Sequence, residues 1–282
     1  MYSSGSSSHS ESASVVRRRA ALAREREARE IDAAERQERL AKVTGVALHV
    51  RLAGVHRRSA ACHRTAAELH EDYARLLASW ERGRGAPPRF MTGVAAACGT
   101  RSAAVTFTGS DHSQLAVAAS NDQARAAQEL EFVLGEGPTR DAMVRHRTVK
   151  ASGALLRARW PGYGPEAEEL GIKEVVAVPL TLRDSCLGSL TVFDPGPGLT
   201  ADFADIAEAL TRTMVSGPQA DPEFYGGVDH RAVVHQAAGM VSVQAACPVA
   251  DALEIIKARA FSEGEPVQDV AARIVHGELR LG

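Results

Sequence analysis

Apolar residues recur three or four positions apart in three short stretches between residues 229 and 275. This spacing places them on one face of a helix. The inward-facing residues expected of the three helices are Val233, Ala237, Met240 and Val241; Val249, Ala252, Leu253, Ile256 and Ala260; and Val267, Val270, Ala271, Ile274 and Val275. Pro248 and Pro266 suit the starts of the second and third helices, and Gly264 suits a left-handed cap between them. The pattern predicts a compact three-helix module over residues 228–277.

Gly239 and Pro248 of this module each allow a separate prediction. Gly239 lies in the middle of the first helix, where glycine costs about 1 kcal/mol relative to alanine. We therefore expect another stretch of backbone to pass close to Gly239. Pro248 stands where a serine would serve as a cap, so the second helix is expected to begin without a side-chain cap.

The middle of the chain, residues 88–216, alternates between strand-like and helix-like runs. The β-rich runs are 104–108, 115–119, 175–182 and 187–193, with turns at 109–112 and 183–185. Helices are expected over 122–132, from the Gly135-Glu136-Gly137-Pro138 turn through Met143, and after Thr200 as an N-cap. The last helix has one apolar face, made of Phe203, Ile206, Ala207 and Leu210. Five or six strands with flanking helices predict an α+β domain with one antiparallel sheet.

The N-terminal third begins with a Ser-rich tail, residues 1–14, in which we expect neither order nor a signal peptide. A helical segment is expected over residues 15–85. Two seven-residue repeats run along its second half, which is the spacing of a left-handed coiled coil. The repeats are Leu48, Val55, Cys62, Leu69 and Leu76, and Leu52, Ser59, Ala66, Tyr73 and Trp80. Two interpretations stay open: this stripe forms a dimer, or it packs on the central domain of its own chain.

Histidines also recur every seven residues on this helix, at His49, His56, His63 and His70. Successive members lie about 10.5 Å apart along the axis, so one helix cannot close two of them around a metal ion. We expect the histidines to form a surface charge that titrates near neutral pH. Residues 1–89 carry 17 Lys/Arg against 11 Asp/Glu, a net charge of +6 before histidine. This third of the chain is therefore basic.

Several runs of the three-helix module resemble a known family. The runs are Gln236-Ala237-Ala238-Gly239-Met240-Val241, Ala250-Asp251-Ala252-Leu253 and Pro266-Val267-Gln268-Asp269-Val270-Ala271. They are similar to the ANTAR output domain, and the resemblance covers the module from end to end. Such domains bind RNA hairpins in nascent bacterial transcripts and suppress transcription termination. The resemblance implies an RNA-binding module, which a linker over residues 217–227 joins to the central domain.

The polar residues expected to contact RNA are Arg231, Gln236, Lys257, Arg259 and Arg273. Residues 228–282 carry five Lys/Arg against seven Asp/Glu, so the module has a net charge of −2. RNA affinity normally draws on neutralised phosphates, and an acidic module lacks that broad attraction, although a hairpin loop can still be recognised by shape and stacking. The basic N-terminal third either supplies this attraction or is a solvated face.

The central domain contains runs that closely resemble the GAF domains found ahead of ANTAR domains in actinobacteria. The runs are Phe132-Val133-Leu134-Gly135-Glu136-Gly137-Pro138, Trp160-Pro161-Gly162-Tyr163, Val178-Pro179-Leu180 and Leu187-Gly188-Ser189-Leu190-Thr191-Val192. The resemblance implies a small-molecule or redox sensor, or a dimerising scaffold, without naming a ligand. Trp160 and Tyr163 either stack on a flat ligand or pack an ordered loop. The Gly-Glu-Gly-Pro run lacks the Lys-Ser/Thr of a phosphate loop and is expected to be a tight turn.

The histidines and cysteines outside these runs do not indicate a catalytic or metal-binding site. His112 and His146 are expected to be surface histidines, and Cys186 has only Arg183 as a basic neighbour, which does not favour a reactive thiol. Four cysteines without close pairing indicate a reducing environment. No apolar run approaches 18 residues, so we expect no membrane partner. No nucleophile, base and orienting group occur together, so we expect neither an enzyme nor a cofactor.

We therefore expect a cytoplasmic, homodimeric antitermination regulator with a GAF sensor and an ANTAR-like output module. The alternative is a small-molecule-sensing or protein-interaction module whose RNA-binding face is degenerate.

Overall fold

The computed structural model describes residues 13–81, 88–109, 114–183, 185–196, 203–216 and 229–281. Residues 1–12 of the expected tail, the 217–227 linker, Thr200 and His112 lie outside the described residues. The chain forms two compact units, one from residues 1–101 and 196–227 and the other from residues 102–195 and 228–282. We describe each unit by itself.

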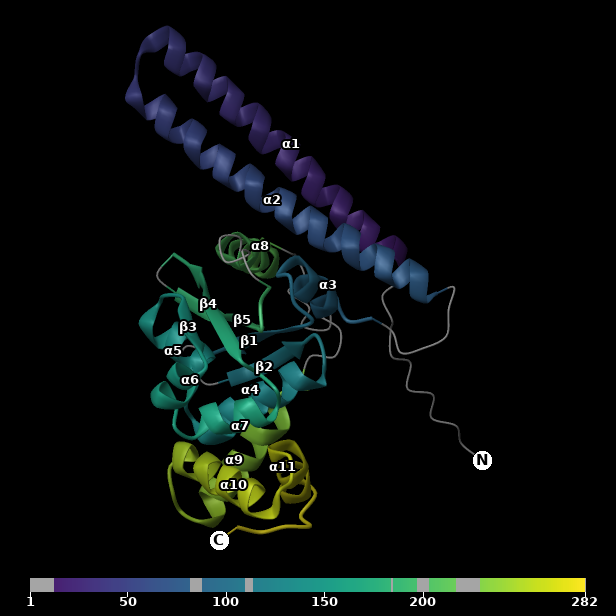
Figure 1. Ribbon diagram of the computed structural model, residues 1–282, viewed down its shortest axis with the longest axis vertical. Helices are drawn as coiled ribbons and strands as arrows, with labels where there is room; N and C mark the ends of the chain where they lie inside the picture. Colours follow the sequence, from purple (N-terminus) through teal and green to yellow (C-terminus); the bar gives the residue numbers. More distant parts are fainter. Residues whose placement is uncertain are drawn as a thin grey trace. The chain divides into compact units, whose positions relative to one another are not determined.

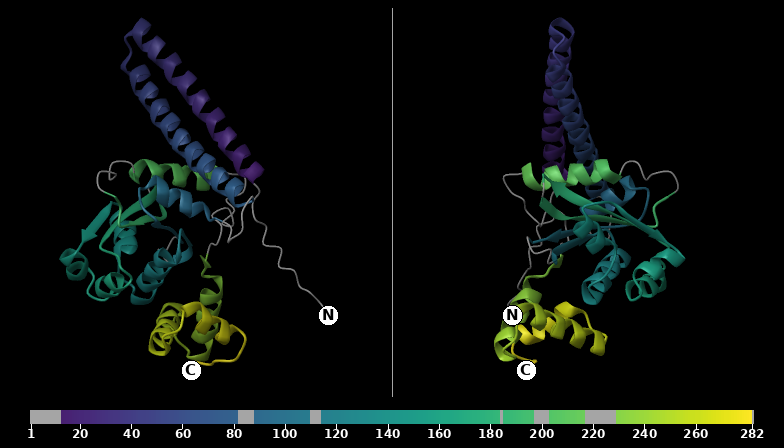
Figure 2. Two further views of the ribbon diagram at one scale, coloured as in Figure 1. Left: turned by 45° about the vertical axis from the view of Figure 1, so that its right-hand side comes forward. Right: turned by 90° about the vertical axis from the view of Figure 1, so that its left-hand side faces the viewer.

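A helical hairpin dominates the first unit (Figures 1 and 2). It consists of α1 (Ala13–Thr44) and α2 (Ala47–Trp80), which run antiparallel and side by side. Gly45 ends α1 in the left-handed region, with φ of 67°, and lets the chain reverse. The expected helical segment over 15–85 is thus present, but it is folded in two. Helix α1 already contains Ala13 and Ser14, so the end of the predicted tail is helical.

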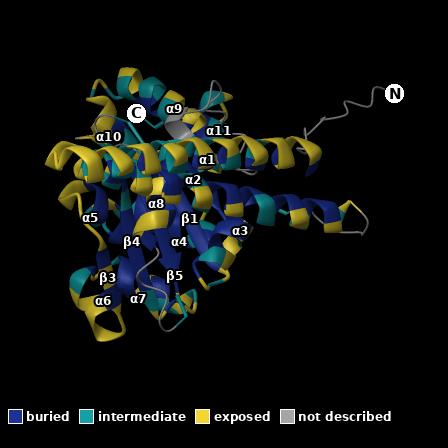
Figure 3. Ribbon diagram, turned by 90° about the horizontal axis from the view of Figure 1, so that it is seen from above, coloured by how far each residue is buried: buried dark blue, intermediate teal, exposed yellow. Residues whose placement is uncertain are grey.

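The predicted coiled-coil stripe of α2 is covered along only part of its length. Toward the C-terminal end of the helix, Cys62 and Ala66 are buried, in one cluster with Ala67, Ala23 of α1 and Ala209 of α8 (Phe203–Ser216). Near the turn, Leu48 and Val55 are half exposed. In Figure 3, the side of α1 seen from above is largely exposed, whereas much of the second half of α2 is buried. The second half of the stripe therefore packs within its own chain, on α8 and α1, and the dimer stays a prediction.

Small residues build the contact between the two long helices. Helix α2 buries a row of alanines spaced by seven residues, Ala53, Ala60, Ala67 and Ala74. Alanine side chains let two helix backbones approach closely, and the seven-residue spacing keeps them on one face. Helix α3 (Phe90–Ala97) packs on the other end of α2, where the Phe90 ring lies 5.6 Å from the rings of both His70 and Tyr73.

The second unit contains one antiparallel sheet in the order β3-β4-β5-β1-β2-β6. The strands are β1 (Ser102–Thr108), β2 (Gln114–Ala119), β3 (Val149–Ser152), β4 (Glu174–Leu182), β5 (Ser185–Phe193) and β6 (Asp229–His230). The four predicted β-rich runs match β1, β2, β4 and β5. Strands β3 and β6 are too short to show an alternating pattern, and their sequences did not identify them.

Four helices pack with this sheet around one core that includes Val117, Leu156, Val175 and Phe193. They are α4 (Asp122–Leu134), α5 (Pro138–Arg145), α6 (Ala154–Arg159) and α7 (Tyr163–Glu169). The Gly-Glu-Gly-Pro run is a tight turn between α4 and α5, as expected. Gly135 ends α4 with φ of 67°, and Pro138 is the first residue of α5.

The C-terminal part of the second unit is the expected three-helix module. It consists of α9 (Ala232–Gln244), α10 (Val249–Glu263) and α11 (Val267–Val275). Helix α10 begins after Pro248 without a side-chain cap and ends at Gly264, with φ of 67°, as predicted. Helix α11 also buries the predicted face.

Two inward positions of this module were predicted wrongly. Val233 and Val249 are 38% and 52% exposed, while Val234 is fully buried. Ala237 and Val241 are buried as predicted, together with Ala238 and Val234, in a core that also includes Phe132 from α4, which the local pattern cannot show. The expectation for Gly239 was wrong as well, since no atom lies within 4 Å of the position that its Cβ would occupy.

Among the described residues, no single helix is long and apolar enough to cross a membrane. Helices α9 and α10 reach that threshold only when taken together, and the pair is bent by 109°.

Two glycine substitutions are expected to have opposite effects. Gly188→Ala would place its Cβ 1.9 Å from the Thr106 carbonyl oxygen, inside the β1–β5 pairing, and should lower the free energy of unfolding by about 3 kcal/mol or more. Gly239→Ala meets no neighbour and should raise it by about 0.5–1 kcal/mol through helix propensity. Urea unfolding of the full chain measures both, and a destabilised Gly239→Ala variant would contradict the open helix surface.

Candidate functional site

Helix α4 is the centre of the candidate site because both of its faces carry polar side chains. Its N-terminus is capped by Asn121, whose side-chain oxygen accepts from the Ala124 N–H at 2.9 Å. Gln128 and Glu131 lie in the core beside the sheet. Phe132, the residue after Glu131, belongs to the core of the three-helix module.

A chain of buried polar side chains crosses the core from β1 to β5. The Thr106 hydroxyl donates to Gln128 Oε1 at 2.5 Å, and Gln128 Nε2 donates to Thr139 Oγ1 at 3.0 Å. Thr139 Oγ1 in turn lies 2.8 Å from Thr191 Oγ1. All four side chains are buried. A satisfied polar network of this kind fixes the relative positions of α4, α5 and the sheet.

Glu131 is a buried carboxyl group at the start of α5. The Arg140 backbone N–H donates to Glu131 Oε1 at 2.6 Å, so the carboxyl caps the first turn of that helix. Gly137 makes room for it, since a Cβ there would lie 2.6 Å from Glu131 Cδ. Burial raises the pKa of Glu131 to about 7, against the opposing effect of hydrogen bonds from Arg140 and Thr139.

Glu136 performs the same role for α7. Its Oε1 accepts from the backbone N–H groups of Gly162 and Tyr163, at 2.6 and 2.9 Å. The glutamate that makes the Gly-Glu-Gly-Pro run unfit for phosphate is thus a helix cap. Sequence reasoning missed both caps. Pro138 marks a helix start, but nothing local shows that carboxyl groups on α4 and in its following turn reach α5 and α7.

Trp160 and Tyr163, the candidate ligand residues, lie in the core. Their side chains are buried, and the two rings meet edge-on with centroids 6.1 Å apart. This location agrees with the second expectation, packing of an ordered loop. Burial, together with the charge of Glu131, raises the pKa of Tyr163 well above its ordinary value.

Around Glu131, three buried polar atoms have no hydrogen-bond partner within the described part of the chain: Glu131 Oε2, Tyr163 Oη and Trp160 Nε1. Two more, Glu129 Oε1 and Arg231 Nη1, lie where α4 meets the three-helix module. Buried polar groups are normally paired, and each exception calls for an explanation. The first three offer a carboxyl oxygen, a hydroxyl and an indole N–H donor.

On its other side, α4 holds two cations of the three-helix module. The Arg231 guanidinium carbon lies 4.3 Å and Lys257 Nζ lies 4.6 Å from the centroid of the Phe132 ring. Arg231 Nη2 also pairs with Glu129 Oε2 at 2.6 Å. Both cations are buried, Arg231 being only 1% exposed. We call these residues, Glu129, Phe132, Arg231 and Lys257, the α4 clamp.

A backbone tether accompanies the clamp. Strand β6 pairs with the end of the sheet through Ala116↔His230 and Val117↔Asp229. The Arg231 N–H donates to the Leu115 carbonyl at 2.9 Å, and its Nε donates to Gln114 Oε1 at 3.2 Å. The module is therefore held at its first residues by the central domain.

The structure does not bring the five predicted RNA-contacting residues together. Arg231 and Lys257 lie in the clamp, where Lys257 also pairs with Glu254 at 2.9 Å. Arg259 and Arg273 both pair with Glu263, at 2.5 and 3.3 Å. Gln236 is exposed on α9. Every cation of the predicted set thus has a carboxylate partner.

Among the described residues, we find neither a reactive cysteine nor a group of cysteine and histidine side chains that could bind a metal ion. Cys186 is half buried, and burial raises the pKa of its thiol, which disfavours the reactive thiolate. His146 is exposed, as expected. Within the described ranges, no three His, Cys, Asp or Glu side chains are placed to hold a metal ion.

The histidine ladder is not a uniform surface feature. His49 Nδ1 lies 2.8 Å from Gln37 Oε1, and His56 Nδ1 lies 2.6 Å from Glu30 Oε2, so both contact α1. His70 is buried against Phe90, and burial lowers its pKa to about 4. The expectation of a surface charge was therefore wrong for His70, which stays neutral near pH 7.

Comparison with known proteins identifies the central domain. Residues 88–216 match the family model of the GAF domain. This part of the chain is a GAF domain, with a five-strand antiparallel sheet and flanking helices preceded by a long helical segment. Comparisons with curated proteins and with solved structures find no match. The resemblance of the C-terminal helices to an ANTAR domain stays a prediction with which their fold is compatible.

Glu131 should make stability depend on pH. Its carboxyl group has an ordinary pKa of 4.5 and a folded-state pKa of about 7, so the folded state binds the proton more tightly. Its contribution is fully present below pH 4.5 and is lost as the pH rises to about 7, a decrease on the order of 3 kcal/mol. Glu131→Gln should remove this slope.

Urea unfolding between pH 4.5 and 8 measures the difference between wild type and Glu131→Gln. Glu136→Gln is the matched control: it weakens the α7 cap but should keep the slope. An equal slope in wild type and Glu131→Gln would contradict the buried, protonated carboxyl group.

Proposed function

We propose that this protein is a signal-responsive RNA-binding regulator of transcription antitermination. The GAF domain binds a small polar molecule, and the three-helix module binds hairpins in nascent transcripts. The observation that carries the proposal is the α4 clamp, in which a sensor helix holds two cations that the module would present to RNA. Support for RNA as the partner comes from the ANTAR-like runs of α9, α10 and α11.

In this proposal, helix α4 connects ligand binding in the GAF domain to the cations of the three-helix module. Glu131 and Phe132 are consecutive residues of α4, so a ligand that pairs with Glu131 Oε2 acts on the helix that holds Arg231. Release of Phe132 would expose Arg231 and Lys257 to phosphate groups. In this proposal two chains act together, each contributing one module to an RNA with two hairpins.

The second candidate function is a ligand-binding or protein-interaction module without RNA. A specific observation favours it: the module has a net charge of −2, and its predicted RNA cations are all neutralised by carboxylates. A protein partner whose binding is insensitive to salt would support this alternative.

Crosslinking and sequencing of RNA copurified with the protein from its own cells, at two salt concentrations, tests the two functions. Leader transcripts with paired hairpins upstream of terminators should be enriched over a control protein. If no RNA is enriched even after the clamp has been opened by substitution, the second function holds.

Opening the clamp should raise RNA affinity. Glu129→Gln removes the carboxylate that pairs with Arg231, and Phe132→Leu keeps an apolar side chain but removes the aromatic ring. Either change should tighten binding of a two-hairpin RNA by about three- to tenfold, which corresponds to a coupling free energy of about 1 kcal/mol. Fluorescence anisotropy with the full chain measures this.

Glu169→Gln is the matched control, because it removes the same charge from an exposed position of α7. Equal affinities of Glu129→Gln and Glu169→Gln would show that the clamp does not restrain the module.

Lys257 and Arg259 are expected to contact phosphate once the module is released. Replacing both by alanine should weaken RNA binding and flatten its dependence on salt by about one to two in the log–log slope. The comparison is best made in the Glu129→Gln background, where Lys257 is free to leave Phe132. A slope equal to that of the parent variant would exclude both residues from the RNA contact.

A further inference from the structure

The helical hairpin contains a long stretch without carboxylates. No Asp or Glu occurs between Glu38 and Glu68, whereas the same stretch holds six Lys/Arg: Arg39, Lys42, Arg51, Arg57, Arg58 and Arg64. The stretch covers the end of α1, the turn at Gly45 and the first half of α2. A basic region of this kind attracts a polyanion unless neighbouring carboxylates neutralise it.

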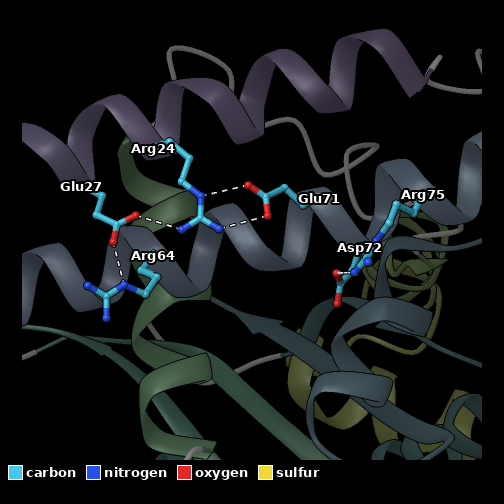
Figure 4. A network of polar contacts seen from close by, with 6 residues as sticks. All are labelled: Arg24, Glu27, Arg64, Glu71, Asp72 and Arg75. Carbon is cyan, nitrogen blue, oxygen red and sulfur yellow. Dashed lines mark hydrogen bonds and ion pairs between the residues drawn. The ribbon is translucent and has the colours of Figure 1, made fainter.

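Neighbouring carboxylates neutralise only some cations of this stretch. Figure 4 shows ion pairs farther from the turn, in which Glu27 accepts hydrogen bonds from both Arg24 and Arg64, and Arg24 also donates to Glu71. Nearer the turn, Arg57 pairs with Glu38 at 3.1 Å, and Arg39 lies 3.8 Å from Glu35 within α1. The pairs of Arg24 with Glu71, Arg64 with Glu27 and Arg57 with Glu38 tie α1 to α2, so these cations serve the hairpin itself.

Three cations of the stretch are left over. Lys42, Arg51 and Arg58 are exposed, and none forms an ion pair with any described residue. Arg51 and Arg58 are seven residues apart, hence on one face of α2, about 10.5 Å apart along its axis. Lys42 lies in the last turn of α1, just before the reversal at Gly45, at the same end of the hairpin as Arg51.

The three-helix module shows the opposite: its predicted RNA-contacting cations are paired with carboxylates. There Arg231, Lys257, Arg259 and Arg273 all have carboxylate partners, and the net charge is −2. A regulator that binds RNA still needs groups that neutralise phosphates. The unpaired cations of the hairpin meet that need.

We propose that the turn end of the helical hairpin is a second RNA-contacting surface, in which Lys42, Arg51 and Arg58 bind the phosphate backbone. The inference rests on the proposed RNA-binding function and adds to it the source of the electrostatic attraction. No Phe, Trp or Tyr occurs between Tyr2 and Tyr73, so this surface lacks the large aromatic side chains on which single-stranded bases commonly stack. It contributes affinity and salt dependence, while the three-helix module selects the hairpin.

The experiment measures binding of a fluorescein-labelled synthetic RNA with two stem-loops to the full chain, between about 50 and 200 mM salt. Lys42→Ala/Arg51→Ala/Arg58→Ala should weaken binding at least about tenfold and reduce the log–log salt slope by two to three. The substituted side chains are exposed, so folding should be unaffected, and urea unfolding checks this. The matched control is Arg140→Ala/Arg147→Ala/Lys173→Ala, which removes three exposed cations of the GAF domain and should keep the slope.

The outcomes separate this inference from the proposed function. If the triple variant keeps the wild-type slope while Lys257→Ala/Arg259→Ala flattens it, the second surface does not exist and the proposed function stands. If the hairpin variant alone abolishes binding and the module variant has no effect, the surface is real and the module does not read RNA.

An anionic membrane is the competing partner, because the turn also exposes Val43, Val46, Leu48 and Val50. Cosedimentation with vesicles of phosphatidylserine and phosphatidylcholine tests it. Vesicle binding that is lost in Val43→Asp, without any binding of RNA, would overturn the inference. Val243→Asp is the control, since Val243 is 83% exposed and Val43 is 84% exposed, each near the end of its helix.

Discussion

Arg231 is the residue on which the placement of the C-terminal module depends. Removing a guanidinium group from water costs several kcal/mol unless charged and polar partners replace the water. The partners of Arg231 are Glu129, Gln114 and the face of Phe132, all from the central domain. The residue directly before α9 is therefore fixed by α4 and β2. Without these partners Arg231 would have to return to solvent, and the module would keep only the β6 pairing and the Phe132 core contact to the central domain.

Helix α4 is itself held by carboxyl groups that cap other helices. Glu131 caps α5 and Glu136 caps α7, so the end of α4 and the turn after it are tied to both. Gly137 admits one of these carboxyl groups at a distance no side chain would allow. The burial of Glu131 opposes its ionisation. The central domain thus keeps a proton-sensitive group one residue away from the ring that holds the module.

Local patterns were enough to predict much of this fold. The alternating runs of β1, β2, β4 and β5 and the stops at Gly135, Pro138 and Gly264 depend on neighbouring residues only, and the structure contains all of them. The ANTAR-like runs fall within α9, α10 and α11, although family membership of that module stays a prediction. What local patterns cannot show is which distant element completes a core.

The wrong predictions share that cause. On α9, Val234 and not Val233 is buried, in a core that also includes Phe132 of α4. The seven-residue repeat of α2 indicated a packed stripe but not its partners, which for the second half of the stripe are α8 and α1. The candidate site was missed for the same reason: Glu131, Glu136 and Arg231 acquire their roles through contacts with residues far along the chain.

The cation–π contacts of the clamp are weak enough for a ligand to offset them. Each contributes about 0.5–2 kcal/mol, and typical coupling free energies between two sites are about 1–3 kcal/mol. A ligand that favoured the open state by that amount would therefore offset one such contact. The side chains are also placed for this coupling. Glu131 and Phe132 are consecutive residues of α4, so their side chains point about 100° apart. A rotation of α4 about its axis that moved Glu131 would therefore also move Phe132, and the two side chains cannot change position independently.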